Sequence, residues 1–164
     1  MTAVLTAALQ TGPPASRVGI VRVVDQLEPS ARPEVVHHLL TSAPGGEAEA
    51  AAILNGFDAV IIQHDYSIYG GPDGDQVISV LARLTVPVIV VLHAVLAEPT
   101  LRQREVLEQV MIAADAVVVT TPTARDCLLQ GYRVDPARVV TIPHDASAEE
   151  YRILAGALVE AAVA

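Results

Sequence analysis

The chain has 164 residues, enough for one domain with a substantial core. Its hydrophobic fraction is 52% and its aromatic fraction only 3%, so that core must be made of Val, Leu, Ile and Ala. The formal charge is -9, and all ten basic residues are arginines scattered along the chain. This composition argues against nucleic acid as a partner, because such binding needs a basic face.

Cysteine usage and hydropathy indicate the compartment. Cys127 is the single cysteine, so no intrachain disulfide can form, and a reducing cytoplasm is predicted. No apolar run approaches the ~20 residues of a membrane span, and residues 1–10 lack the basic segment and cleavage site of a secretory leader. We therefore expect a soluble, cytoplasmic protein with no membrane span.

The first third of the chain combines helical and strand patterns. Met1–Leu9 has apolar residues at helical spacing, and Val18–Val24 is an apolar run that predicts a strand. Glu34–Leu40 fits either a short strand or a helical turn. Glu47–Leu54 is rich in Ala and predicts a helix, which Asn55-Gly56 ends.

Strand and helix patterns alternate from Asp58 onward. Strands are predicted at Ala59–Gln63, Pro87–Leu92, Ala116–Thr120 and Val139–Ile142. Helices are predicted from about Gly74 to Leu84 with Asp73 as N-cap, from a capping box at Thr100–Gln103 to about Ala114, from Thr121-Pro122 to Gly131, and from a second capping box at Ser147–Glu150 onward. The alternation predicts an α/β fold in a single domain, residues 1–164, with a Rossmann-like, mostly parallel sheet and helices on both faces.

Three of the predicted strands end in histidine. These residues are His64, His93 and His144. Parallel strands share one carboxyl edge, where ligands bind in open α/β sheets, so the three imidazoles could line one crevice with Asp65, Tyr66, Thr120, Thr121 and Asp145. Histidine suits such a site because it changes charge near neutral pH. A strand-end histidine is also an ordinary hydrogen-bonded loop residue, and this reading stays open for each of them.

Glycines follow the richest of these strand ends. Gly70, Gly71 and Gly74 could offer backbone N–H groups to an anion beside a helix start, or could simply form a turn. Neither GxxxxGK[ST] nor GxGxxG occurs in the chain, so the glycines do not match a known phosphate-binding motif.

Five segments in order resemble the N-terminal domain of family 4 glycosyltransferases, retaining enzymes of the two-domain GT-B fold. They are QHDYSIYGGPDG, VPVIVVLHAVL, PTLRQREVLEQV, ADAVVVTTPTARDCLL and YRVDPARVVTIPHD, within roughly residues 17–145. Each piece alone is weakly specific, whereas the ordered set is strong. The resemblance implies transfer of a sugar from a nucleotide sugar to an acceptor, with the acceptor held mainly by this domain and no metal or other cofactor strictly needed.

The resemblance also implies roles for particular residues. His93 matches a histidine near the donor sugar and diphosphate and is the implied catalytic residue. The resemblance places His64 in the same cleft. The strand-end and glycine positions add Asp65, Tyr66, Gly70, Gly71, Thr120, Thr121 and His144 as predicted substrate-binding residues. His144-Asp145 departs from the family pattern, which has glycine after the histidine.

Two parts of the family pattern are not matched. The family begins with a central strand and a glycine-rich loop, whereas Met1–Gln10 resembles the helix after them. The family's C-terminal donor domain is also unmatched, and residues 148–163 resemble a tail helix that packs back on the first domain. Without the central strand, we expect Val18–Val24 and Ala59–Gln63 either to pair directly or to be covered in an oligomer, because exposed strand edges associate.

Three functions follow from these patterns. The first is the acceptor-side half of a nucleotide-sugar-dependent glycosyltransferase, inactive alone. It would be either a truncated or degenerate copy, or a chain that works with a separate donor-domain chain or as a homo-oligomer. The second is a non-catalytic Rossmann-like module that binds a partner or small ligand. The third is a metal-dependent hydrolase with His64, His93, His144 and the neighbouring Asp residues as ligands, although no compact motif such as HExxH supports it.

Overall fold

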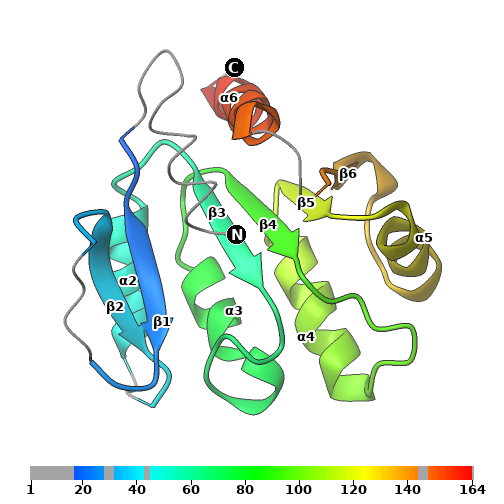
Figure 1. Ribbon diagram of the computed structural model, residues 1–164, viewed down its shortest axis with the longest axis horizontal. Coiled ribbons are helices and arrows are strands. Elements are labelled where there is room, and N and C mark those ends of the chain that lie inside the picture. The colour runs from blue at the N-terminus through cyan, green and yellow to red at the C-terminus, as the bar shows by residue number, and fades with distance from the viewer. Residues whose placement is uncertain (1–16, 28–31, 43–44, 144–147, 164) are drawn as a thin grey trace.

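The computed structural model describes residues 17–27, 32–42, 45–143 and 148–163, and Figure 1 shows how their elements are arranged. In chain order the strands and α-helices are β1 Ile20–Val24, β2 Val35–Leu40, α2 Gly46–Leu54, β3 Val60–His64, α3 Gln76–Leu81, β4 Val88–Leu92, α4 Leu101–Ile112, β5 Ala116–Val119, α5 Pro122–Gly131, β6 Val139–Thr141 and α6 Ala148–Val163. Short 3₁₀ turns at Pro72–Gly74 and Pro136–Arg138 precede α3 and β6.

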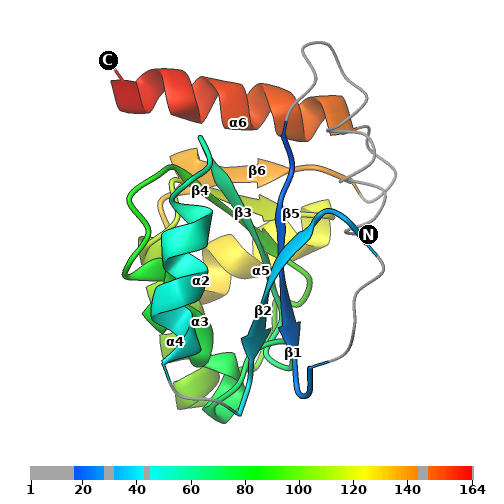
Figure 2. The same cartoon turned by 90° about the vertical axis from the view of Figure 1, so that its left-hand side faces the viewer.

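The strands form two parallel sheets. Strands β3, β4, β5 and β6 make a four-stranded sheet in that order, and β1 pairs with β2 in a second sheet. Helices α3, α4 and α5 cover one face of the larger sheet, and α6 lies across the other (Figure 2). The predicted α/β fold with parallel strands and helices on both faces is therefore confirmed.

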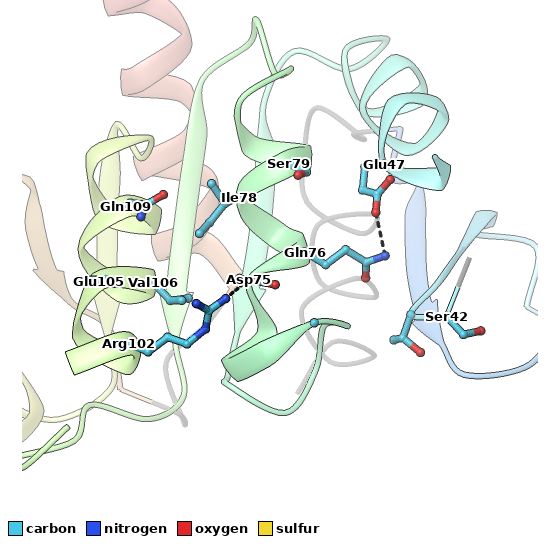
Figure 3. Close-up of a pocket in the computed structure, with 12 residues that line it drawn as sticks. Ser42, Glu47, Asp75, Gln76, Ile78, Ser79, Arg102, Glu105, Val106 and Gln109 are labelled. Carbon is cyan, nitrogen blue, oxygen red and sulfur yellow. Dashed lines mark hydrogen bonds and ion pairs between the residues drawn. The ribbon is translucent and has the colours of Figure 1, made fainter. Parts of the chain in front are cut away.

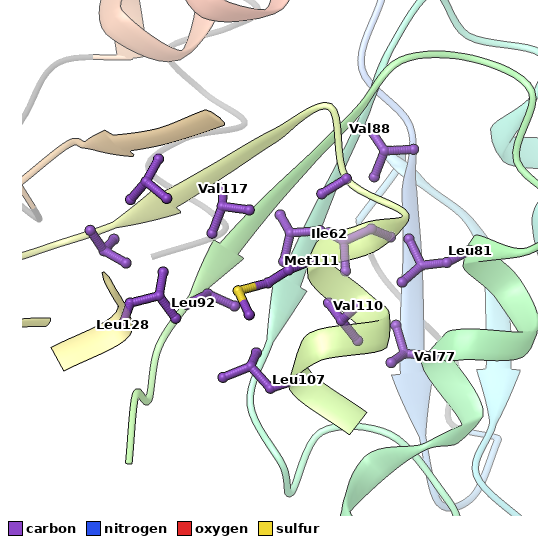
Figure 4. Packing of buried hydrophobic residues seen from close by; sticks show 14 of the residues in the cluster. Ile62, Val77, Leu81, Val88, Leu92, Leu107, Val110, Met111, Val117 and Leu128 are labelled. Atoms are coloured by element: carbon purple, nitrogen blue, oxygen red, sulfur yellow. The ribbon is translucent and has the colours of Figure 1, made fainter. Parts of the chain in front are cut away.

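The core follows from the aliphatic strands. Every residue of β4 is buried, as expected for a strand with helices on both faces. Val88, Val90 and Leu92 pack toward α3 and α4, where Leu107 and Met111 meet them (Figure 4). On the opposite face, Ile89 and Val91 pack with Tyr151, Leu154 and Leu158 of α6. The apolar side chains of the terminal helix therefore cover this face of the sheet.

Strands β1 and β3 do not pair, so the expectation of direct pairing was wrong. No backbone hydrogen bond joins β1 to β3. The two sheets are instead connected by the packing of α2 on α3. The ring of Phe57 lies so close to Gly19 that a Cβ added there would be 2.4 Å from it. A side chain thus occupies the space between the chain segments where backbone pairing would begin. The other expectation, coverage in an oligomer, stays a prediction.

Some predicted elements differ from those in the structure or lie in residues that the structure does not describe. Helix α3 is shorter than predicted and has Asp75 at its N-cap position. Asp73 does not cap it but lies in the preceding 3₁₀ turn, with φ of 56°. Glu34–Leu40, left open by its pattern, forms strand β2. The predicted helix Met1–Leu9 and Ser147, the N-cap of the second predicted capping box, lie outside the described residues. No described helix is both long enough and apolar enough to cross a bilayer.

The capping box of α4 is confirmed and gives a first test. Thr100 Oγ1 accepts from the Gln103 N–H at 3.2 Å, and Gln103 Oε1 accepts from the Thr100 N–H at 3.0 Å. Thr100→Ala should lower the free energy of unfolding by about 1 kcal/mol, because one helix-start N–H loses its partner. Thr123→Ala, at an exposed position within α5, is the control and should change it by less than about 0.5 kcal/mol. Urea unfolding measures both, and equal costs would contradict the capping role.

Candidate functional site

The carboxyl ends of β3, β4 and β5 meet at one edge of the larger sheet (Figure 1). His64 ends β3 and His93 directly follows β4, and the His93 N–H donates to the His64 carbonyl oxygen at 3.0 Å. The two backbones therefore lie side by side, as the strand pattern predicted.

The two side chains nevertheless lie on opposite faces of the sheet. His64 continues the alternation of Val60 and Ile62 and packs edge-on against Tyr66, with ring centroids 5.5 Å apart. His93 is exposed, and its Nε2 lies 2.7 Å from Gln63 Oε1, on the face that Gln63 shares with Ile61. The two imidazoles thus share an edge but not a pocket.

Burial controls the chemistry of His64. Its side chain is fully buried, and neither ring nitrogen has a hydrogen-bond partner among the described residues. Desolvation lowers its pKa from 6.5 to about 4, against the opposing effect of the Asp65 carboxylate. His64 is therefore neutral at physiological pH and cannot act as a cationic ligand for phosphate in this structure.

Asp65 and Tyr66 are held by local contacts. The Asp65 carboxylate accepts hydrogen bonds from the Ser67 hydroxyl at 2.7 Å and the Ser67 N–H at 3.0 Å, and these bonds lower its pKa. Burial is the main cause of the raised pKa of Tyr66, whose buried hydroxyl has no hydrogen-bond partner among the described residues. Asp65 is therefore ionised at neutral pH and half-buried at the edge, whereas Tyr66 remains protonated.

The two glycines predicted to bind substrate have clear structural roles. A Cβ on Gly70 would lie 2.3 Å from the Thr41 carbonyl oxygen, so only glycine allows the loops after β2 and β3 to approach this closely. The Gly70 N–H donates to Gln76 Oε1 at 3.1 Å, which engages it within the protein. Gly71 has φ of 81°, a conformation that also favours glycine.

Thr120 and Thr121 lie where β5 passes into α5. Thr120 is half-buried, and Thr121 is exposed and caps the helix by accepting the Ala124 N–H at 3.1 Å. His144 lies outside the described residues. The edge that the structure describes therefore combines an exposed imidazole, a carboxylate and two threonines.

A separate open groove lies between α2, α3 and α4, with a volume of about 560 Å³ (Figure 3). Gln76 Nε2 donates to Glu47 Oε1 at 3.0 Å and to the Leu40 carbonyl oxygen at 3.0 Å, while Asp75 pairs with Arg102 across the groove. Hydrogen bonds, chiefly a backbone one, lower the pKa of Glu47. Of the predicted site residues that the structure describes, only Gly71 lines this groove.

None of the polar residues of this groove was predicted as a site residue. Glu47, Gln76 and Arg102 each fall in or next to the first turn of a helix that follows a strand, and that position was the available signal. Nothing in the sequence pairs Asp75 with Arg102, because their helices are brought together only by packing on the sheet.

Metal ligation finds no support in the part of the chain that the structure describes, where no group of three or more His, Cys, Asp or Glu side chains could hold an ion. Comparisons of the chain with protein-family models, curated proteins and solved structures found no match.

Proposed function

We propose that this chain is the acceptor-side half of a nucleotide-sugar-dependent glycosyltransferase. The observation that supports this most is His93, an exposed imidazole positioned by Gln63 at the carboxyl edge of a parallel sheet. This edge is where α/β proteins of this architecture bind their ligands. The ordered motifs that resemble family 4 glycosyltransferases supply the reaction class.

The residues at the edge suit recognition of hydroxyl groups. Asp65 is an ionised acceptor, and the exposed His93 can exchange donor and acceptor roles with protonation. Gln63 restricts the His93 ring through the 2.7 Å contact, which reduces the entropy lost on binding. In the proposed role, these groups hold an acceptor hydroxyl while a second chain presents the nucleotide sugar. The second chain is needed because correct orientation of the donor supplies much of the rate acceleration.

Binding by the isolated chain tests the proposal. In saturation-transfer NMR, we expect weak signals from a panel of free sugars and polyols and none from UDP-glucose or GDP-mannose. His93→Ala should remove the sugar signals, whereas the surface control Thr123→Ala should keep them. Tight binding of a nucleotide sugar in calorimetry, or sugar signals that survive His93→Ala, would contradict the half-enzyme.

A non-catalytic binding module is the second candidate, and the opposed orientation of His64 and His93 favours it. In that case His93→Ala would change only stability. The same orientation disfavours a hydrolase in which both histidines hold one metal, because ligands to one ion must converge. Metal analysis of the purified protein checks this point.

A further inference from the structure

The outward face of α4 carries apolar side chains that the core does not use. Leu101 is 82% exposed and Ile112 is 74% exposed, and these are the two most exposed large aliphatic side chains among the described residues. Eleven residues of an α-helix make about three turns and 20° more, so both side chains lie on one line along the helix, about 16 Å apart. The buried side of the helix is a separate stripe that includes Leu107, Val110 and Met111 (Figure 4).

Two carboxylates lie between these aliphatic ends. Glu105 and Glu108 fall within about 40° of the same line along the helix. Glu105 is exposed, and the Glu108 carboxylate accepts the backbone N–H of Arg133 at 3.1 Å, a bond that brings no neutralising charge. Neither carboxylate forms an ion pair with a described residue. We use the name α4 ridge for this line of side chains, which consists of Leu101, Glu105, Glu108 and Ile112.

The two arginines of α4 bind to neighbouring elements on either side of the ridge. Arg102 pairs with Asp75 at the N-cap position of α3. Arg104 donates to the Gly131 carbonyl oxygen at the end of α5, and its guanidinium carbon lies 5.2 Å from the centre of the Tyr132 ring. Both guanidinium groups are therefore engaged beside the ridge, and the line between its aliphatic ends carries only negative charge.

A hollow borders the α4 ridge on each side. One is the groove of about 560 Å³ between α2, α3 and α4, and the other, of about 460 Å³, lies between α4 and the end of α5. Glu105 lines both hollows, and Figure 3 shows it beside the first. A ridge between two hollows suits the packing of a second helix, because the side-chain rows of one helix fit into the grooves of another.

We propose that the α4 ridge docks an amphipathic helix of a different protein chain, whose aliphatic side chains meet Leu101 and Ile112 and whose lysines or arginines lie between them. The aliphatic ends favour an apolar partner, because contact removes their exposed surface from water. The carboxylates favour a basic partner, because covering them with neutral groups would remove their hydration without compensation. Contact along a single helix buries a small area, so the complex should be weak and reversible. This inference does not depend on the proposed glycosyltransferase function.

Charge argues against a second copy of this chain as the partner. In an antiparallel contact that places Leu101 against Ile112, Glu105 faces Glu108 of the second copy. In a two-fold contact between parallel helices, each residue faces its own counterpart, so the carboxylates meet again. Like charges in contact disfavour both arrangements, whereas a basic helix is attracted whichever way it runs.

A synthetic helix tests the proposal on the full chain. The probe is an alanine-based peptide with two leucines spaced as Leu101 and Ile112 are, and with two lysines between them, spaced as Glu105 and Glu108 are. In an NMR titration of the isotope-labelled protein, shift changes should be largest at the amides of the α4 ridge, and added salt should weaken binding. Leu101→Ala should weaken binding about tenfold, because one of the two apolar contacts is lost. Ile153→Ala is the control, since it truncates an aliphatic side chain that is 62% exposed on α6, and it should leave binding unchanged.

Charge and self-association are tested separately. A matched peptide with glutamates in place of the lysines should not bind, and equal binding of the two peptides would overturn the basic partner. Failure of the lysine peptide to bind, or shift changes centred away from α4, would overturn the docking role itself. In analytical ultracentrifugation, Leu101→Ala should leave the association state of the chain unchanged. A dimer that this substitution dissociates would assign the ridge to a second copy and overturn the proposal of a different chain.

Discussion

Leu107→Ala should lower the free energy of unfolding by about 2–5 kcal/mol, the largest effect that we expect from a single substitution in this chain. Leu107 is fully buried in the middle of α4, in the cluster formed with Val90, Val110 and Val117 (Figure 4). Truncation removes its apolar surface from the core and leaves a cavity, because helices α3 and α5 on either side prevent α4 from collapsing onto the sheet.

Leu101→Ala is the matched control, since it makes the same change in the same helix. Leu101 is 82% exposed at the first position of α4, so its truncation should cost less than about 0.5 kcal/mol. Urea unfolding followed by circular dichroism measures both variants. Comparable losses at the two positions would mean that α4 does not pack on the sheet as described.

His64→Leu should make the protein more stable, and increasingly so in mild acid. The His64 pKa is lowered from 6.5 to about 4 by burial, so the unfolded chain binds a proton that the folded chain rejects between these values. The folded state is therefore destabilised as the pH falls from about 6.5 toward 4. By pH 5 the loss attributable to His64 reaches about 2 kcal/mol, from the linkage relation.

At pH 7 the variant should gain about 1–3 kcal/mol, because leucine removes two buried ring nitrogens that have no partner among the described residues. Between pH 7 and pH 5, the stability difference between His64→Leu and the wild type should widen by about 2 kcal/mol. Leu107→Ala, which removes no titratable group, should show the same offset at both pH values. A constant offset for His64→Leu would show that the imidazole is not buried in the neutral form.

The carboxylates affect stability at lower pH than His64 does, so the two effects can be measured separately. The pKa of Asp65 is lowered chiefly by its Ser67 hydrogen bonds, and that of Glu47 chiefly by a backbone hydrogen bond. The stability that they contribute is present above their unfolded pKa values and is lost as the pH falls through the lowered ones. Acid unfolding below about pH 4 therefore reports on these groups, and the range from 6.5 to about 4.5 reports on His64.

Local rules sufficed for most of the secondary structure. The apolar run before Gln63 and the wholly apolar run of β4 predict buried strands because no amphipathic alternative exists for them. Thr100 and Thr121 mark helix starts because their hydroxyls accept from N–H groups only three residues away. Such signals are short-range, so the sequence alone determined the α/β class, five of the six strands among the described residues and the two best-defined helix starts.

Long-range arrangement was decided only by the tertiary structure. Period-two alternation could have assigned His64 and His93 to opposite faces, but only with the register of β3 against β4, which pairs His64 with Leu92. Strands β1 and β3 do not pair, and in the segments before them Phe57 lies against Gly19, a contact between residues 38 positions apart. The sequence by itself determined which residues reach the strand ends, and the tertiary structure decided which of them face one another, because side-chain direction depends on strand register and on packing between distant segments.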